Sequence, residues 1–264
     1  MKKIGWFTTG RDEAAIELLE MVYSQIKSNF LPLEIAYVFV SKDWGETSIS
    51  DELLRKAKEE MNLKVITFSA LKFNPELRRE NLIKWRDLYH QEILRILSEK
   101  VDFGVLAGYM WIVSDEFCEK MKLINLHPAL PGGPKGSWQE VIWQLISCRS
   151  SETGVMIHQV TPDLDEGPPL SFVKFSIKTP AFLPLWEKTE KVLLKYHLKG
   201  LKEREGEKNP LFLKIREEGV KRELPLIVYT LKYIAEDKII WGDPQLPLDL
   251  TEKIETYLKS KHFS

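Results

Sequence analysis

The feature that most constrains the fold is a regular alternation of strand-like and helix-like segments over the first 126 residues. Short apolar runs with the length of strands occur at residues 3–8, 34–40, 64–68 and 101–107. The segments between them repeat apolar residues every three or four positions, which is the period of a helix with one buried face. Such alternation predicts an α/β domain with a doubly wound, mostly parallel sheet. The nearly all-apolar run at 101–107 is expected near the middle of that sheet.

The rest of the chain continues the pattern and then departs from it. Helices are expected at residues 15–26, 51–61, 75–97 and 137–146, further strands at 154–160 and 170–177, a helix rich in Lys and Glu at 185–201, and another starting at Pro210. Ser137 and Glu140 have the spacing of a capping box, which supports a helix start there. Residues 223–235 are expected to form a closing helix with Pro225 at its start, followed by a terminal strand and helix.

We therefore predict three parts. Residues 1–178 form the α/β domain, 179–219 an inserted helical segment, and 220–264 the closing helix and C-terminal tail of the same domain. The inserted segment has two interpretations: an amphipathic decoration with a solvated charged face, or a lid or partner surface that selects the substrate.

Composition limits the function classes. Hydrophobic residues make up 44% of the chain and the formal net charge is -1, which argues against disorder and against a general nucleic-acid surface. No apolar run is long enough to span a bilayer, so we expect no membrane partner and a cytoplasmic location. The histidines and cysteines lack the spacing of metal ligands, so no metal is expected. Assembly into a homo-oligomer is compatible with the sequence.

Polar residues follow several of the expected strands. In open parallel sheets, ligands bind beyond the carboxyl ends of the strands, where Gly10, residues 108–112 and the pair Asn125 and His127 all fall. Residues two apart on an extended chain project to the same side, so Asn125 and His127 can face one point. The plainer alternative is that Asn125 caps a turn and His127 is a satisfied, half-buried histidine.

The turn after the first expected strand has the pattern of an anion site. Gly10, Arg11 and Asp12 lie between this strand and a helix, where unsatisfied backbone N–H groups and the helix dipole converge. We predict that these three residues bind the substrate, with Arg11 making a charge-assisted contact to a phosphate. An exposed arginine after a turn is the alternative.

Two motifs, taken together, resemble the formyltransferase family that uses 10-formyltetrahydrofolate. The family patterns are Asn-x-His-Pro-Ser-x-Leu-Pro, and then a His-x-Val strand followed by Leu-Asp-x-Gly-Pro. This chain supplies, for the first, Asn125, His127, Pro128, Leu130 and Pro131, and, for the second, His158, Val160, Leu164, Asp165, Gly167 and Pro168. The resemblance covers roughly residues 1–177 and returns near 223–239, and it is strongest to the members that formylate phosphoribosylglycinamide.

The resemblance implies a Rossmann-like formyltransferase fold and an enzyme of one-carbon metabolism. Its co-substrate is expected to be 10-formyltetrahydrofolate, and its acceptor a primary amine. The default acceptor is a phosphorylated amine, phosphoribosylglycinamide of purine biosynthesis. Attack of the amine on the formyl carbon gives a tetrahedral intermediate whose oxyanion needs preorganised donors. Asn125 and His127 are the expected donors, and Asp165 is expected to favour the protonated imidazole and to take the amine proton.

The resemblance also implies a folate site between two segments. Its expected residues are Met110, Trp111, Ile112 and Val113 on one side and Val160, Thr161 and Asp163 on the other. Trp111 stands where the family often has Arg, and of the family's Gly-x-Gly-Ser-Asn phosphate loop only Gly10 matches. His158 is expected to support its loop instead of reacting.

Three alternative functions use the same residues. A formyltetrahydrofolate deformylase would have water in place of the amine. A formyltransferase for another amine, such as an amino sugar on a nucleotide, would take its acceptor contacts from the inserted segment. A folate-binding protein without activity would explain the incomplete phosphate loop.

Overall fold

The computed structural model describes residues 1–242 and 246–261, and these residues group into two compact units. The first unit comprises Met1–Leu126, His158–Pro168 and the described residues from Ile227 to Gly242. The second comprises His127–Ile157, Pro169–Leu226 and the described residues from Leu246 to Lys261.

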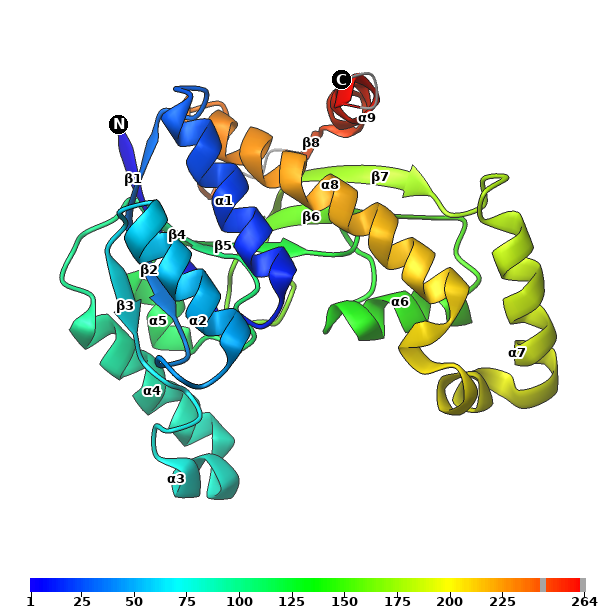
Figure 1. The fold of residues 1–264 in the computed structure, drawn as a ribbon, viewed down its shortest axis with the longest axis horizontal. Coiled ribbons are helices and arrows are strands. Elements are labelled where there is room, and N and C mark those ends of the chain that lie inside the picture. The colour runs from blue at the N-terminus through cyan, green and yellow to red at the C-terminus, as the bar shows by residue number, and fades with distance from the viewer. Residues whose placement is uncertain (243–245, 262–264) are drawn as a thin grey trace. The chain divides into compact units, whose positions relative to one another are not determined.

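The elements follow one another along the chain as labelled in Figure 1. They are β1 (Lys2–Thr8), α1 (Glu13–Lys27), β2 (Leu33–Val40), α2 (Ser48–Arg55), a π-helical turn (Lys56–Glu60), β3 (Val65–Thr67), α3 (Pro75–Glu80), α4 (Leu82–Ile96), β4 (Phe103–Leu106), α5 (Asp115–Lys120), β5 (Leu123–His127), α6 (Trp138–Ser147), β6 (Glu152–Gln159), β7 (Pro169–Ser176), α7 (Leu183–Arg204), a short 3-10 helix (Gly206–Lys208), α8 (Pro210–Ala235), β8 (Leu248–Asp249) and α9 (Thr251–Lys261).

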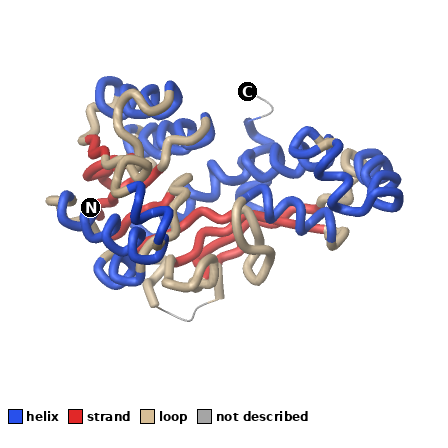
Figure 2. The backbone as a smooth tube through the Cα atoms, turned by 90° about the horizontal axis from the view of Figure 1, so that it is seen from below, coloured by secondary structure: helices blue, strands red, loops and turns tan. Residues whose placement is uncertain are grey.

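The strands, red in Figure 2, form a sheet in the order β3-β2-β1-β4-β5-β6-β7-β8. The pairs β1/β2, β1/β4, β2/β3, β4/β5 and β7/β8 are all parallel. The predicted doubly wound, mostly parallel α/β fold is confirmed, and so is the central position of β4. The carboxyl ends of β1, β4 and β5 therefore lie at one edge of the first unit's part of the sheet.

Aromatic side chains fill one core of the first unit. Phe7, Tyr37 and Phe39 come from the strands, and Trp85 and Tyr89 pack on them from α4. Two strand glycines leave room for neighbouring side chains of this core, which explains why they interrupt apolar runs. A Cβ atom on Gly5 would lie 2.6 Å from Tyr37 Oη, and one on Gly104 would lie 2.6 Å from Leu123 Cδ2.

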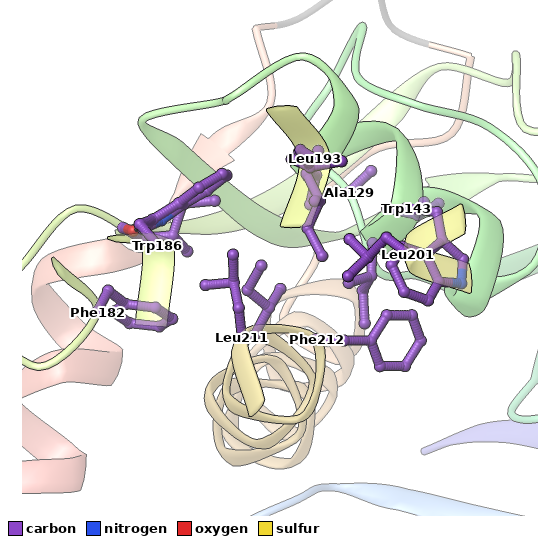
Figure 3. Packing of buried hydrophobic residues seen from close by; sticks show 14 of the residues in the cluster. Ala129, Trp143, Phe182, Trp186, Leu193, Leu201, Leu211 and Phe212 are labelled. Atoms are coloured by element: carbon purple, nitrogen blue, oxygen red, sulfur yellow. The ribbon is translucent and has the colours of Figure 1, made fainter. Parts of the chain in front are cut away.

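The second unit has its own core, which includes the predicted inserted segment. In Figure 3, Leu211 and Phe212 of α8 point toward Trp186, Leu193 and Leu201 of α7 and toward Ala129 and Trp143. The rings of Trp143 and Phe212 are 4.7 Å apart between centroids. One face of the α7–α8 segment is therefore buried in this core. Helix α8 also runs continuously across residues 219 and 220, where a domain boundary was expected; the three-part division itself stays a prediction.

Three local expectations were wrong. The single helix at 75–97 is interrupted at Asn81, because its backbone is not helical (φ -148°, ψ 87°) and its side chain caps α4 by accepting from Lys84 N (3.0 Å). The helix expected from residue 51 begins at Ser48, because Thr47 is its cap. Pro225 lies inside α8 instead of at a helix start.

Neither a membrane span nor a metal site is found in the described ranges. No helix within residues 1–242 and 246–261 is long and apolar enough to cross a membrane. Nor do His, Cys, Asp and Glu side chains of these residues form a group able to hold a metal ion.

His90 on α4 is fully buried and should make stability depend on pH. Its Nδ1 donates to Arg86 O (2.8 Å), and burial, which penalises the charged ring, lowers its pKa from 6.5 to about 4. Between pH 6.5 and 4 the unfolded chain binds the proton more readily than the folded protein does. The stability that the folded protein gains from the neutral His90 is therefore fully present above pH 6.5 and is lost as the pH falls toward 4. We expect the free energy of unfolding to fall by up to about 3 kcal/mol over this pH range.

The measurement is urea unfolding of the wild type and of His90→Gln at pH 7 and pH 4.5. The free energy of unfolding should fall less in the variant than in the wild type. An identical fall in both proteins would rule out His90 as the cause.

Candidate functional site

The turn between β1 and α1 is held by its own side chains. Gly10 has φ +58°, a conformation that favours glycine, and a Cβ there would also lie 3.3 Å from Ser50 Cβ. Asp12 caps α1 by accepting from Ala15 N at 3.4 Å, and Arg11 Nη2 donates to Asp12 Oδ2 at 3.2 Å. The carboxylate of Asp12 thus lies at the helix N-terminus where the sequence predicts a bound anion. Any substrate phosphate must share this position with it.

Two residues of this region were missed by the sequence analysis. Lys42, which follows β2, donates to Gly10 O at 3.3 Å and to Thr47 Oγ1 at 3.2 Å, and adds a second cation to the turn. Thr9 Oγ1 accepts from Met110 N (2.9 Å) and from Ser41 Oγ (3.1 Å). Thr9 therefore ties the ends of β1, β2 and β4 together. No sequence periodicity indicates either contact, because the partners are far apart along the chain.

The segment after β4 presents apolar side chains at its surface. Met110 and Ile112 are 41% and 46% exposed, whereas Val113 is buried in the aromatic core. Trp111 is half-buried, and its ring lies 5.1 Å from that of Trp85. The exposed Met110 and Ile112 side chains can cover a flat apolar ring. Val113 can contribute only through its backbone.

A polar cluster lies at the end of β5 within the first unit. Asn125 Nδ2 is 3.1 Å from His158 Nε2, and His158 Nδ1 donates to Gln159 O at 2.8 Å. Because the Nδ1 proton is used by a carbonyl, Nε2 of the neutral ring accepts from the Asn125 amide. Asp165 Oδ1 lies 3.9 Å from the same Nε2. His158 thereby fixes the direction of the Asn125 side chain and leaves the second N–H of that amide for a ligand.

The loop that carries Asp165 has a constrained backbone. Asp165 has φ +55° while its side chain is only 7% exposed, so the carboxylate is buried at a turn that few residues adopt. Gly167 makes this path possible, because a Cβ there would lie 1.7 Å from Gln159 O. Such strain is often found at functional sites.

The other residues expected on the folate side lie in the same loop region. Val160 N donates to Leu123 O at 2.8 Å, and Val160 packs partly on the aromatic core. Thr161 Oγ1 donates to Asp163 O at 3.2 Å. Asp163 itself is exposed. These residues shape the loop through their backbone, and their predicted contacts to folate stay predictions.

His127, at the end of β5 in the second unit, is buried. Its Nε2 donates to Pro134 O at 2.9 Å, so a carbonyl of the following loop holds one edge of the ring.

Taken by chemistry alone, the first unit offers an oriented amide and a buried carboxylate, and the second unit offers an imidazole with one fixed edge. Such groups can stabilise charge that develops on an oxygen and can accept a proton.

Sequence comparison supports a specific family. A family model described as Formyl transferase matches residues 15–181, more than half of the chain. A phosphoribosylglycinamide formyltransferase of Dictyostelium discoideum is 29% identical over 160 residues, which are 56% of this chain and 73% of that protein. A methionyl-tRNA formyltransferase of Wolbachia sp. is 34% identical over 148 residues, 55% of this chain and 44% of that protein. The chain spans about half the length, 48%, of the matching phosphoribosylglycinamide formyltransferase of Saccharomyces cerevisiae.

Solved structures share the fold. Glycinamide ribonucleotide transformylase 1 of Geobacillus kaustophilus superimposes with a TM-score of 0.63 at 20% identity, over 89% of this chain and 99% of that one. A formyltetrahydrofolate deformylase of Pseudomonas syringae gives 0.63 at 17% identity, over 94% of this chain and 66% of that one. Because a transformylase and a deformylase share this fold, the fold alone does not distinguish formyl transfer from hydrolysis. The match to the family model shows that this chain belongs to the formyl transferase family.

Proposed function

We propose that this chain transfers a formyl group from 10-formyltetrahydrofolate to a primary amine, and that phosphoribosylglycinamide is the acceptor. The formyl donor follows from membership of the formyltransferase family. The acceptor rests on the similarity to phosphoribosylglycinamide formyltransferases. The single observation that carries the proposal is the cluster in which His158 holds the Asn125 amide beside the buried carboxylate of Asp165.

In this proposal each residue has one task. The second N–H of the Asn125 amide donates to the formyl oxygen as negative charge develops there, and the His127 imidazole is the second proposed donor. The amine nitrogen forms a bond to the formyl carbon to give a tetrahedral intermediate, and the bond from that carbon to the donor nitrogen then breaks. Asp165 accepts the proton that the amine loses, directly or through water, and passes it to the leaving donor nitrogen. His158 is a positioning residue, because it acts through Asn125.

The donor's flat ring fits the apolar surface of Met110 and Ile112. The backbone of residues 160–163 would line the other side. Gly10, Arg11 and Asp12 would meet the acceptor, with Arg11 pairing with its phosphate. Because Asp12 already engages Arg11, the phosphate has to compete with that carboxylate.

The acceptor assignment predicts a specific kinetic effect. In a transfer assay that detects formylated phosphoribosylglycinamide by mass spectrometry, Arg11→Ala should raise the KM for this acceptor about tenfold or more, because one charge-assisted hydrogen bond is lost. The KM for the formyl donor should stay nearly unchanged. No transfer by the wild type would remove phosphoribosylglycinamide as the acceptor, and an unchanged KM in the variant would remove Arg11 from its site.

Hydrolysis of the donor by water is the second candidate, because the deformylase fold matches as well as the transformylase fold. It predicts formate release without any amine.

A further inference from the structure

An open pocket of about 470 Å³ lies within the second unit, among β7, the start of α7, α8 and α9. None of the residues that line it belongs to the candidate site described above. Its ionisable lining residues are three cations and two carboxylates, namely Lys174, Lys214, Arg222, Glu218 and Glu255. The lining therefore has a surplus of one positive charge.

Arg222 on α8 is almost fully buried at this pocket, with only 8% of its surface exposed. Its Nε donates to Glu255 Oε1 at 2.7 Å, and its Nη1 donates to the backbone oxygen and to Oε2 of Glu218, both at 2.8 Å. The guanidinium lies over the Phe175 ring, with Cζ 4.3 Å from the ring centroid, so its orientation is fixed. No group in the described part of the chain accepts from Nη2. Nη2 is therefore an oriented donor that Arg222 can offer to the pocket.

The remaining charged groups of the lining differ in how firmly they are paired. Glu218 also forms an ion pair with Lys214 Nζ at 3.0 Å, so this carboxylate already has two cationic partners. Lys174, by contrast, has a half-exposed side chain whose Nζ is 3.8 Å from Asp249 Oδ2. Its ammonium can turn into the pocket at little cost, because exposed ion pairs contribute little. The available donors of the pocket thus come from Arg222 and Lys174, and they favour an anion.

The N-terminus of α7 adds a weaker contribution of the same sign. Its first turn contains no acidic residue, and its N-cap, Phe182, makes no side-chain capping hydrogen bond. The partial positive charge of this helix end is therefore not offset by a side chain of its own. Phe175, Ala181 and Phe182 all line the pocket, so apolar residues lie beside the donors.

We propose that this pocket binds a small organic monoanion, an aromatic or alicyclic carboxylate, whose carboxylate group accepts from Arg222 Nη2 and whose ring lies against the apolar residues of the lining. A single negative charge matches the single surplus positive charge of the lining. A volume of about 470 Å³ is also typical of sites for small organic molecules. This inference does not depend on the proposed function.

The test uses naphthalene-2-carboxylate and its neutral analogue, naphthalene-2-carboxamide, as probes in isothermal titration calorimetry. The wild type should bind the carboxylate at least about tenfold more tightly than the amide, because the amide cannot accept a charge-assisted hydrogen bond. In Arg222→Gln this preference should disappear.

A second variant keeps the test decisive if Arg222→Gln does not fold, because Arg222 also holds Glu218 and Glu255. Ala181 is exposed and lines the pocket, so the indole of Ala181→Trp should fill the pocket without disturbing the core. Binding of both probes should then be lost.

Lys174→Gln should weaken binding of the carboxylate by about twofold to fivefold and leave binding of the amide unchanged, because it removes a partly exposed charge. Lys199→Gln is the matched control. Lys199 lies on α7, its side chain is 89% exposed, and it does not line the pocket, so this variant should bind both probes as the wild type does.

Three results would overturn the proposal. They are equal affinity of the wild type for the two probes or no binding of the carboxylate at millimolar concentration, a preference that persists in Arg222→Gln, and binding that Ala181→Trp leaves unchanged. Because the assay contains neither a formyl donor nor an amine acceptor, each of these results would leave the proposed function standing.

Discussion

Replacing Asp165 by asparagine should lower the turnover of formyl transfer by a factor of about 100 or more, because it removes the proposed proton acceptor. The change is nearly isosteric. Asparagine also tolerates the left-handed backbone, φ +55°, that position 165 adopts. The loop should therefore keep its path, and the affinity for a folate probe should change little. Steady-state kinetics of purified wild type and variant, with the folding of both checked by circular dichroism, give the measurement.

Glu166→Gln is the matched control for this variant. Glu166 is the next residue in the same loop, carries the same charge and has no proposed catalytic role. Its turnover should stay within about twofold of the wild type. Full activity in Asp165→Asn would contradict the proposed proton transfer. An equal loss of turnover in both variants would show that the effect comes from the charge of the loop.

Gly167→Ala should destabilise the loop strongly. The added Cβ would be 1.7 Å from Gln159 O, a backbone atom that accepts from His158 Nδ1 and whose peptide group donates through Val160 N to Leu123 O. We expect a loss of about 2–4 kcal/mol in the free energy of unfolding and a Tm lower by roughly 10 °C. Transfer activity should fall as well, because Asp165 lies two residues away.

Gly219→Ala tests whether this effect is local. Gly219 lies inside α8, and a Cβ there meets no atom within 4 Å. Alanine should raise stability by about 0.5–1 kcal/mol, because it lowers the entropy cost of forming a helix. A Tm in Gly167→Ala equal to that of the wild type would contradict the close approach at Gly167.

Much of the fold could be predicted from the sequence, because its signals are local. The apolar runs ending at Thr8 and Val40 have strand length and are separated by helical periodicity, and the Ser137–Glu140 capping box starts α6 as expected. Local signals gave wrong predictions at positions where one residue type fits two different local structures. Asn81 continues a helical pattern but caps a new helix, and Pro225, which usually ends or starts a helix, lies within α8 next to the fully buried Leu226.

The motif residues of the candidate site could also be found from the sequence, but their contacts could not. Asn125 and Asp165 are visible as motif positions, whereas the contact of Asn125 with His158 joins strands far apart along the chain. Lys42 reaches Gly10 across 32 residues, and Arg78 meets Trp111 from a helix that shows no motif. These contacts depend on packing, which residue patterns do not encode.

The most direct test of the account is to measure transferred formyl and released formate in the same reaction. The protein is incubated with 10-formyltetrahydrofolate, with and without phosphoribosylglycinamide, and both products are quantified. The account predicts a formylated amine in near one-to-one ratio to donor consumed, and little formate when the amine is left out. Formate released at the same rate with and without the amine, and no formylated amine, would contradict it.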